Sequence, residues 1–162
     1  MKVGISSLDK KFMTEAITLA REKMTAGEGG PFGAVITRGD EILARGWNRV
    51  TSTNDPTAHA EIVCIRRACE AVNDFDLSGC VLYSSCEPCP MCLAAVYWAG
   101  IERVVFGADR HDAAKAGFND DLIYRELGMK REKRSIRMQC LMRDAALEGF
   151  RLWEEFEDKI LY

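Results

Sequence analysis

The chain has 162 residues, a length that favours one domain with a single sizeable core. Its net charge of −3 argues against a nucleic-acid binder. No apolar run approaches the ~20 residues of a membrane helix, and the first residues lack a secretory pattern, so we expect no membrane partner and a cytoplasmic location. The seven cysteines are an odd number, which favours reduced thiols over a disulfide framework.

The predicted elements alternate between helices and strands. In chain order we expect a helix over 9–25, a hairpin over 34–50 and a helix from 56. A strand over 80–85, a helix over 90–100 and a strand over 103–108 follow. The last expected elements are a helix at about 119–127, a strand at about 136–142 and a helix at about 143–157. Ser6 or Ser7 is the expected cap of the first helix. Such alternation, with one early hairpin, predicts an α/β layer structure with a mixed sheet.

The segment "SSCEPCPMCLAA", residues 84–95, places Cys86, Cys89 and Cys92 at a strict spacing of three. A bacterial iron–sulfur run would need a fourth cysteine at position 96, which is Val96. A structural zinc site made of four cysteines would usually show a second C-x2-C pair elsewhere in the chain, and the sequence has no such separate pair. On these residues alone, a redox pair and a set of buried small thiols both stay open.

Two helix starts together indicate a catalytic metal site. Cys89 and Cys92 lie one turn apart at the start of a predicted helix, where the helix dipole stabilises thiolates. Two thiolates and one neutral imidazole balance a Zn²⁺ and leave its fourth position for water, which is the ligand count of a catalytic zinc. His59, at another predicted helix start, is the candidate third ligand. Glu61, two residues further on, then stands beside the water as a general acid and base.

The combination H-x-E and P-C-x-x-C is the signature of zinc deaminases. In isolation, His59 would be a helix cap or a satisfied core histidine. With both halves present, we expect zinc-bound hydroxide to attack a ring carbon that carries an amino group. Glu61 then moves the water proton to a ring nitrogen and a further proton to the amino group, which leaves as ammonia. A structural zinc module without activity would leave Glu61 without a purpose.

The chain is identified as resembling the cytidine/deoxycytidylate deaminase superfamily, and within it the bacterial guanine deaminases. The residues that carry this resemblance are "GGPFGAVI" (29–36), "NDPTAHAE" (54–61), "SCEPCPMC" (85–92), "YWA" (97–99), "DAAKAGFNDDLIY" (112–124) and Tyr162. The resemblance implies a three-layer α/β/α fold with a five-stranded mixed sheet. It also implies conversion of guanine to xanthine and ammonia, and a homodimer that exchanges its C-terminal segments, about 143–162.

The same resemblance implies roles for five further residues. Asn48 hydrogen-bonds the purine base, and Phe32 and Trp98 line its pocket. Asp120 assists proton transfer, and Tyr162 closes the pocket of the partner subunit. From the residues alone, Phe32 and Trp98 are as readily core aromatics, and Asn48 is as readily a cap for the loop that follows it.

Several alternatives stay open. Asp121 competes with Asp120 as the carboxylate that faces the site, and Cys86 and His111 have no assigned role. Guanosine, cytosine and triazine amines are further candidate substrates. A tRNA adenosine deaminase would share "DPTAHAE", "EPCPMC" and "RVVFGA", and the basic run over 130–137 would suit phosphate contacts. The acidic balance, "GGPFG" and "NDD" favour a small purine base instead.

Overall fold

The computed structural model describes residues 4–162 and divides into two compact units, one ending at Asp121 and one spanning Leu122–Tyr162. The first unit contains α1 (Ser7–Thr25), β1 (Gly33–Arg38), β2 (Glu41–Trp47), α2 (Val50–Thr53), α3 (Ala60–Val72), β3 (Cys80–Cys86), α4 (Pro90–Trp98), β4 (Arg103–Ala108) and α5 (Arg110–Lys115). Within the described residues, no helix is both long enough and apolar enough to span a bilayer.

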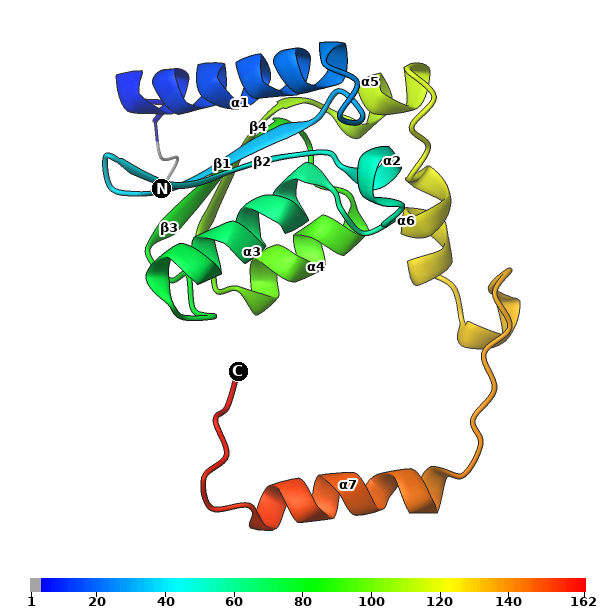
Figure 1. Ribbon diagram of the computed structural model, residues 1–162. Helices are drawn as coiled ribbons and strands as arrows, with labels where there is room; N and C mark the ends of the chain where they lie inside the picture. The colour runs from blue at the N-terminus through cyan, green and yellow to red at the C-terminus, as the bar shows by residue number, and fades with distance from the viewer. Residues whose placement is uncertain (1–3) are drawn as a thin grey trace. The chain divides into compact units, whose positions relative to one another are not determined.

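The sheet of the first unit is mixed, as the sequence predicts. Its strand order is β2-β1-β3-β4, in which β1 runs antiparallel to both of its neighbours and β3 runs parallel to β4. Helix α1 covers one face of the sheet, and α3 and α4 cover the other (Figure 1). The first unit is therefore a three-layer α/β/α structure.

The central strand β1 builds the core on both of its faces. Ala34 and Ile36 belong to the apolar cluster beneath α3 and α4, whereas Val35 belongs to the cluster beneath α1. This division follows from the two-residue period of a strand, which sends successive side chains to opposite faces. Both faces of β1 are covered by helices, so the strand reads as a continuous apolar run rather than an alternating one.

The expectation of a fifth strand is not confirmed. Within residues 4–162 the sheet has four strands, and the strand expected over 136–142 is absent. That segment alternates apolar and polar residues, but its Ile136 and Met138 are exposed. Alternation alone cannot make a strand, because an extended backbone also needs a neighbouring strand for its hydrogen bonds.

The helices differ from the expectation mainly at the start of α3 and in two short helices. The second long helix begins at Ala60 rather than near Pro56, because residues 55–58 form a turn in which Thr57 donates hydrogen bonds to Asp55. Two short helices, α2 and α5, were not expected from the periodicity. Asp109 caps α5 by accepting the backbone N–H groups of His111 and Asp112.

The regular structure of the second unit is helical, and irregular segments join its helices. Helix α6 (Asp121–Leu127) starts at the last residue of the first unit, and η1 (Arg131–Lys133) and α7 (Arg143–Glu155) follow. Glu126 Oε2 accepts the backbone N–H of Ser135 at 2.8 Å, which ties α6 to the segment after η1. Helix α7 has no buried residue, and large apolar side chains along the unit are exposed: Phe150, Leu152, Trp153, Phe156, Ile160 and Leu161.

Candidate metal and catalytic site

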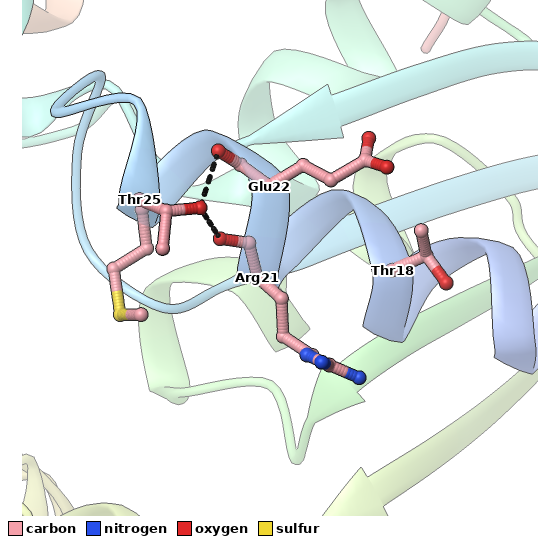
Figure 2. Close-up of a pocket in the computed structure, with 5 residues that line it drawn as sticks. Thr18, Arg21, Glu22 and Thr25 are labelled. Atoms are coloured by element: carbon pink, nitrogen blue, oxygen red, sulfur yellow. Dashed lines mark hydrogen bonds between the residues drawn. The ribbon is translucent and has the colours of Figure 1, made fainter.

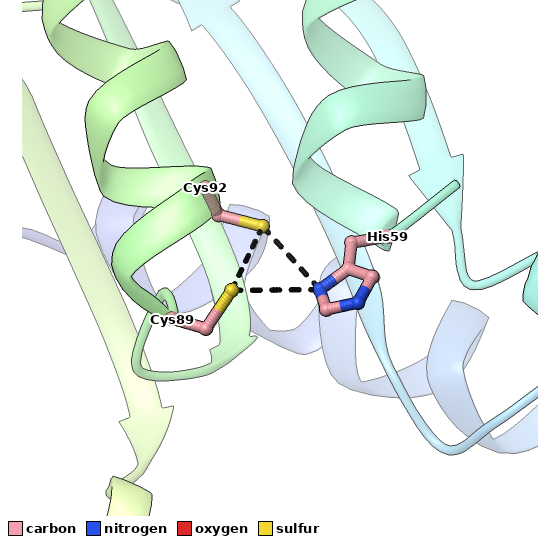
Figure 3. A group of neighbouring side chains, drawn as sticks. All are labelled: His59, Cys89 and Cys92. Atoms are coloured by element: carbon pink, nitrogen blue, oxygen red, sulfur yellow. Dashed lines mark hydrogen bonds between the residues drawn. The ribbon is translucent and has the colours of Figure 1, made fainter. Parts of the chain in front are cut away.

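The starts of α3 and α4 bring the three predicted metal ligands together. His59 is the N-cap residue of α3, and Cys89 is the N-cap residue of α4. Pro90 follows Cys89 at the first helical position, where its fixed φ favours helix initiation, and Cys92 lies one turn further on. The side chains of the three ligands point toward one another between the two helices (Figure 3).

The spacing of the three donor atoms fits a zinc ion. The two sulfurs lie 3.6 Å apart, and His59 Nδ1 lies 3.6 Å from Cys89 Sγ and 3.5 Å from Cys92 Sγ. Tetrahedral coordination with Zn–S near 2.3 Å and Zn–N near 2.05 Å requires about 3.8 Å between sulfurs and about 3.6 Å between sulfur and nitrogen. The donor set therefore matches the size and the ligand preference of Zn²⁺ without rearrangement.

The two cysteines differ in protonation. Hydrogen bonding between the two sulfurs lowers the pKa of Cys89 to about 4, and the hydrogen bond with His59 acts in the same direction. The same hydrogen bond, together with burial, raises the pKa of Cys92. The hydrogen bond with Cys89 also raises the pKa of His59 above its usual value. In this arrangement one thiolate is already formed, and metal binding needs to displace the proton of the other.

Glu61 lies in the first turn of α3, and its side chain is 5% exposed. Its Oε2 lies 3.5 Å from Cys92 Sγ, and its Oε1 accepts a hydrogen bond from Ser84 Oγ at 3.2 Å. Burial raises the pKa of Glu61. A carboxyl group beside a metal site, with a hydrogen-bond partner at each oxygen and a raised pKa, is suited to take up and release protons.

Asn48 follows β2 and has a fixed orientation. Its Oδ1 accepts backbone N–H groups from Gly30 at 3.1 Å and from Val50 at 3.2 Å. Its own backbone N–H donates to the carbonyl oxygen of Phe32 at 3.0 Å. Because Oδ1 already accepts two hydrogen bonds, the Nδ2 group is the part of the side chain available to a ligand, and it can only donate.

Phe32 packs edge-to-face against Phe118, with ring centroids 4.8 Å apart and an interplanar angle of 84°. Phe32 is partly buried against the apolar cluster that also contains Ala34 and Ile36. Phe118 comes from the "AGFNDD" segment that leads to Asp120, so this pair joins the loop before β1 to the chain beyond α5. The role of Phe118 was not predicted, because such a contact between distant segments has no local sequence pattern.

The two neighbouring carboxylates are distinguished by their surroundings. Asp120 Oδ1 is buried and has no hydrogen-bond partner among the described residues. Burial raises its pKa, the charge of Cys89 acts in the same direction, and the Asp120 charge in turn raises the pKa of His59. Asp121 begins α6, and its backbone N–H donates to Asn119 Oδ1. Asp120 is therefore the carboxylate in electrostatic contact with the ligand cluster.

Two predicted substrate residues have exposed side chains in this chain. Trp98 ends α4, nine residues beyond Cys89 or roughly 13 Å along a helix, and is 68% exposed. Tyr162 belongs to the second unit and is 81% exposed. Their assignment to a substrate pocket stays a prediction.

The residues without an assigned role lie apart from the ligand set. Cys86 is buried at the end of β3, its Sγ lies 3.8 Å from the carbonyl oxygen of Asp109, and burial raises its pKa to about 11. His111 is exposed near the start of α5. Neither belongs to the three-residue group that spans the metal position.

A separate surface pocket of about 310 Å³ is lined by α1 residues alone: Thr18, Arg21, Glu22, Met24 and Thr25 (Figure 2). The Thr25 hydroxyl donates to the carbonyl oxygens of Arg21 and Glu22, at 2.6 and 3.0 Å, and is therefore occupied by its own helix. Polar groups from different elements do not converge here, so this pocket has no feature of a catalytic site.

Comparison with known proteins places this geometry in a family. Residues 6–108 match the model of the cytidine and deoxycytidylate deaminase zinc-binding region. The chain is 48% identical over 151 residues to the guanine deaminase of Bacillus subtilis, covering 93% of this chain and 97% of that protein. A tRNA-specific adenosine deaminase of B. subtilis is 43% identical over 100 residues, which is 62% of each chain.

Solved structures agree with these matches. The X-ray structure of B. subtilis guanine deaminase superposes with a TM-score of 0.92 at 46% identity, covering 98% of this chain and 99% of that one. A guanine deaminase from Nitrosomonas europaea superposes with a TM-score of 0.66 at 30% identity, covering 96% of this chain and 88% of that one. The fold, the His59–Cys89–Cys92 cluster and the matched sequence lead to one conclusion: this chain belongs to the cytidine and deoxycytidylate deaminase family.

Proposed function

We propose that this protein is a zinc-dependent guanine deaminase, which hydrolyses guanine to xanthine and ammonia. The observation that carries the proposal is the 48% identity to a guanine deaminase over 93% of this chain, which extends beyond the sheet into the second unit. His59, Cys89 and Cys92 would hold the metal. When bound, Zn²⁺ supplies Lewis-acid chemistry and lowers the pKa of water toward ~7, so that a nucleophile is available at neutral pH.

Glu61 carries the protons of the reaction. Its Oε2, which faces Cys92, accepts the proton of the attacking water and delivers it to the ring nitrogen beside the reacting carbon. A second transfer moves the proton of the newly added hydroxyl group to the 2-amino group, which then leaves as ammonia. One water molecule is consumed for each guanine converted. Burial of Glu61 raises its pKa, which makes the carboxylate a stronger base toward the proton of water.

The orientation of Asn48 determines what it recognises. Its Oδ1 is held by two backbone N–H groups, so Nδ2 is the group that meets the substrate. A donor fits an acceptor atom of the purine ring or of its carbonyl group. Phe32, stabilised by Phe118, supplies an apolar wall beside Asn48.

Asp120 is the second carboxylate of the proposed mechanism. Its unpartnered, buried Oδ1 and its electrostatic contact with His59 and Cys89 support a position next to the reacting groups. A buried carboxylate oxygen without a donor costs free energy unless a ligand satisfies it. A substrate amino group, or the departing ammonia, would supply that donor.

We further propose that the protein is a homodimer that exchanges its C-terminal segments. The exposed apolar residues of α7 and of the tail support this, because such a stripe is stable only when another surface covers it. A second copy of the chain would supply such a surface. Tyr162 then closes the pocket of the partner subunit, and Trp98 lines the purine pocket beside Phe32.

A tRNA adenosine deaminase is the second candidate. It is favoured by the 43% identity to such an enzyme, although that match covers 62% of this chain, whereas the guanine deaminase match covers 93%. Ammonia release from a panel of guanine, guanosine, cytosine, a triazine amine and an anticodon stem-loop with adenosine separates the candidates. We expect guanine to be the best substrate by at least a hundredfold in kcat/KM. Preferential release from the stem-loop would replace the proposal with the second candidate.

A further inference from the structure

Ser84 is a polar side chain in an apolar place. It lies on β3 with 1% of its surface exposed, between Leu82 and Cys86 on the strand face that points toward α3 and α4. Its partner across the antiparallel ladder is Ala34, and its partner on β4 is Phe106. A hydroxyl group in such surroundings costs free energy unless it makes a hydrogen bond.

That hydrogen bond goes to the proton carrier of the proposed reaction. Ser84 Oγ donates to Glu61 Oε1 at 3.2 Å, across a sequence separation of 23 residues. An ionised carboxylate only accepts, so the hydroxyl is the donor in this pair. The contact connects the middle of the sheet to the first turn of α3.

The second contact of Glu61 disappears when the metal site is filled. Glu61 Oε2 receives the proton of the Cys92 thiol at 3.5 Å in the present structure. Metal ligation requires Cys92 as a thiolate, which has no proton to donate. Of the Cys92 and Ser84 donors, only the Ser84 hydroxyl then remains. It holds Glu61 Oε1, the oxygen that does not face the ligand cluster.

We propose that Ser84 is a positioning residue for proton transfer: its hydroxyl holds Glu61 Oε1, so that Oε2 stays directed at the reacting groups. This inference rests on the proposed function. It also explains why a hydroxyl stands at a strand position whose neighbours on the same face are buried and apolar.

Three zinc-loaded variants test the proposal by steady-state kinetics with guanine. We expect Ser84→Ala to lower kcat about tenfold, with KM within about twofold and one zinc per chain, because the lost contact acts on a proton transfer rather than on binding. Ser84→Thr keeps the hydroxyl and should recover most of the lost kcat. The matched control is Ser85→Ala, which removes the next hydroxyl, one that accepts the Gly33 N–H, and should leave kcat unchanged.

A double-mutant cycle separates positioning from a general structural role. In the Glu61→Gln background, Ser84→Ala should lower kcat less than twofold further, because the group through which Ser84 acts is already gone. A full tenfold loss in that background would overturn the proposal. So would unchanged kcat in zinc-replete Ser84→Ala.

A crystal structure of zinc-loaded Ser84→Ala gives a readout that does not depend on turnover. We expect the Glu61 carboxylate to leave its position or to occupy several positions, and a single unmoved conformer would overturn the inference. The crystal structure still tests the proposal if the extra methyl group in Ser84→Thr disturbs packing and prevents the recovery of kcat. If the unmodified protein releases no ammonia from guanine, the proposed function fails. The crystal structure alone then tests whether Ser84 positions Glu61.

Discussion

At the scale of single residues, the ligand cluster combines groups whose charges depend on one another. Hydrogen bonding with Cys92 and with His59 lowers the pKa of Cys89, so the site is electrostatically prepared for a cation. Cys86, only three residues before Cys89, is kept neutral by burial, which raises its pKa to about 11. Two cysteines of one motif therefore differ in function because they differ in surroundings.

The first prediction follows from this difference. Cys89→Ala should lose bound zinc and activity together, because two ligands bind the ion far more weakly than three. Cys86→Ala should retain one zinc per chain and most of the activity. Elemental analysis of both purified variants checks the prediction, and full zinc occupancy in Cys89→Ala would contradict the ligand assignment.

The second prediction concerns the proton carrier. Glu61→Gln keeps the size of the side chain and can still accept the Ser84 hydrogen bond, but an amide cannot carry the proton. We expect bound zinc and the melting temperature to stay near those of the unmodified protein and kcat to fall by about 10²–10⁴-fold. Measurable turnover close to that of the unmodified protein, in a zinc-replete sample, would show that another group moves the protons.

The convergence of His59, Cys89 and Cys92 was predictable from sequence because each lies in a short motif at a helix start, where position within the helix determines direction. The Ser84–Glu61 contact was not predictable, because it depends on how β3 and α3 pack across 23 residues of chain. The same holds for the contact between Phe32 and Phe118. Tyr162 stays a prediction for a related reason: its assigned position is over the pocket of a second chain. Trp98 stays a prediction because its assigned neighbour is the substrate.

At the scale of elements, one buried carboxylate attaches α1 to the sheet. Asp9 accepts the backbone N–H of Ser6 at 2.7 Å and so completes the capping box of α1. It also accepts the Tyr83 hydroxyl at 2.7 Å and pairs with Arg103 at 3.0 Å, which ties the helix to β3 and β4. The Ser6 backbone hydrogen bond, together with those of Tyr83 and Arg103, holds the pKa of Asp9 well below its usual range, although burial opposes the shift.

The third prediction is a pH dependence of stability. Because the pKa of Asp9 is lower in the folded than in the unfolded protein, its contribution is fully present above the unfolded value of ~3.9 and is lost as pH falls further. Asp9→Asn should lower the free energy of unfolding at pH 7 by about 2 kcal/mol and flatten its decline between about pH 5 and 2. Urea denaturation at several pH values measures both effects.

The matched control for this helix attachment is Glu15→Gln. Glu15 forms an ion pair with Arg45 at 2.7 Å, but both side chains are more than 40% exposed, so we expect a change below about 1 kcal/mol. Equal losses in the Asp9 and Glu15 variants would show that α1 is not attached mainly through the buried carboxylate.

Element prediction from sequence succeeded where a local pattern and its partners both exist. The hairpin of β1 and β2, the strands β3 and β4, and the long helices were predicted because periodicity and caps determine them. The prediction of a strand over 136–142 was wrong. Alternating apolar residues do not determine whether a neighbouring strand is available for pairing. The short helices α2 and α5 span fewer than two turns, too few for a periodic pattern.

At the scale of the whole molecule, the second unit leaves apolar surface without cover. Trp153 and Phe156 stack on each other at 6.4 Å, yet they are 40% and 53% exposed. Leu161 and Tyr162 at the end of the chain are 75% and 81% exposed. These observations support the proposal that a second copy of the chain completes both the core of this segment and the pocket.

The fourth prediction tests the exchanged tail. Deleting Leu161–Tyr162 should leave zinc content and melting temperature nearly unchanged, because neither residue is buried in the chain itself. It should lower kcat/KM for guanine at least tenfold, which is about 1.4 kcal/mol of transition-state stabilisation.

Subunit mixing decides whether the tail acts between chains. Mixing the truncated chain with Glu61→Gln should restore activity, because one exchanged heterodimer then holds an intact Glu61 beneath an intact tail. Mass spectrometry of the mixture verifies that subunits exchange. Exchange without recovered activity would show that the tail acts within its own chain or has no role in catalysis.

The most direct test of the central claim is a zinc titration of the metal-free protein, with guanine consumption, xanthine formation and ammonia release followed together. The account predicts that activity rises in proportion to added zinc and reaches its maximum at one ion per chain, with xanthine and ammonia formed in equal amounts. Full activity without zinc, or a zinc-loaded protein that leaves guanine unchanged, would contradict it.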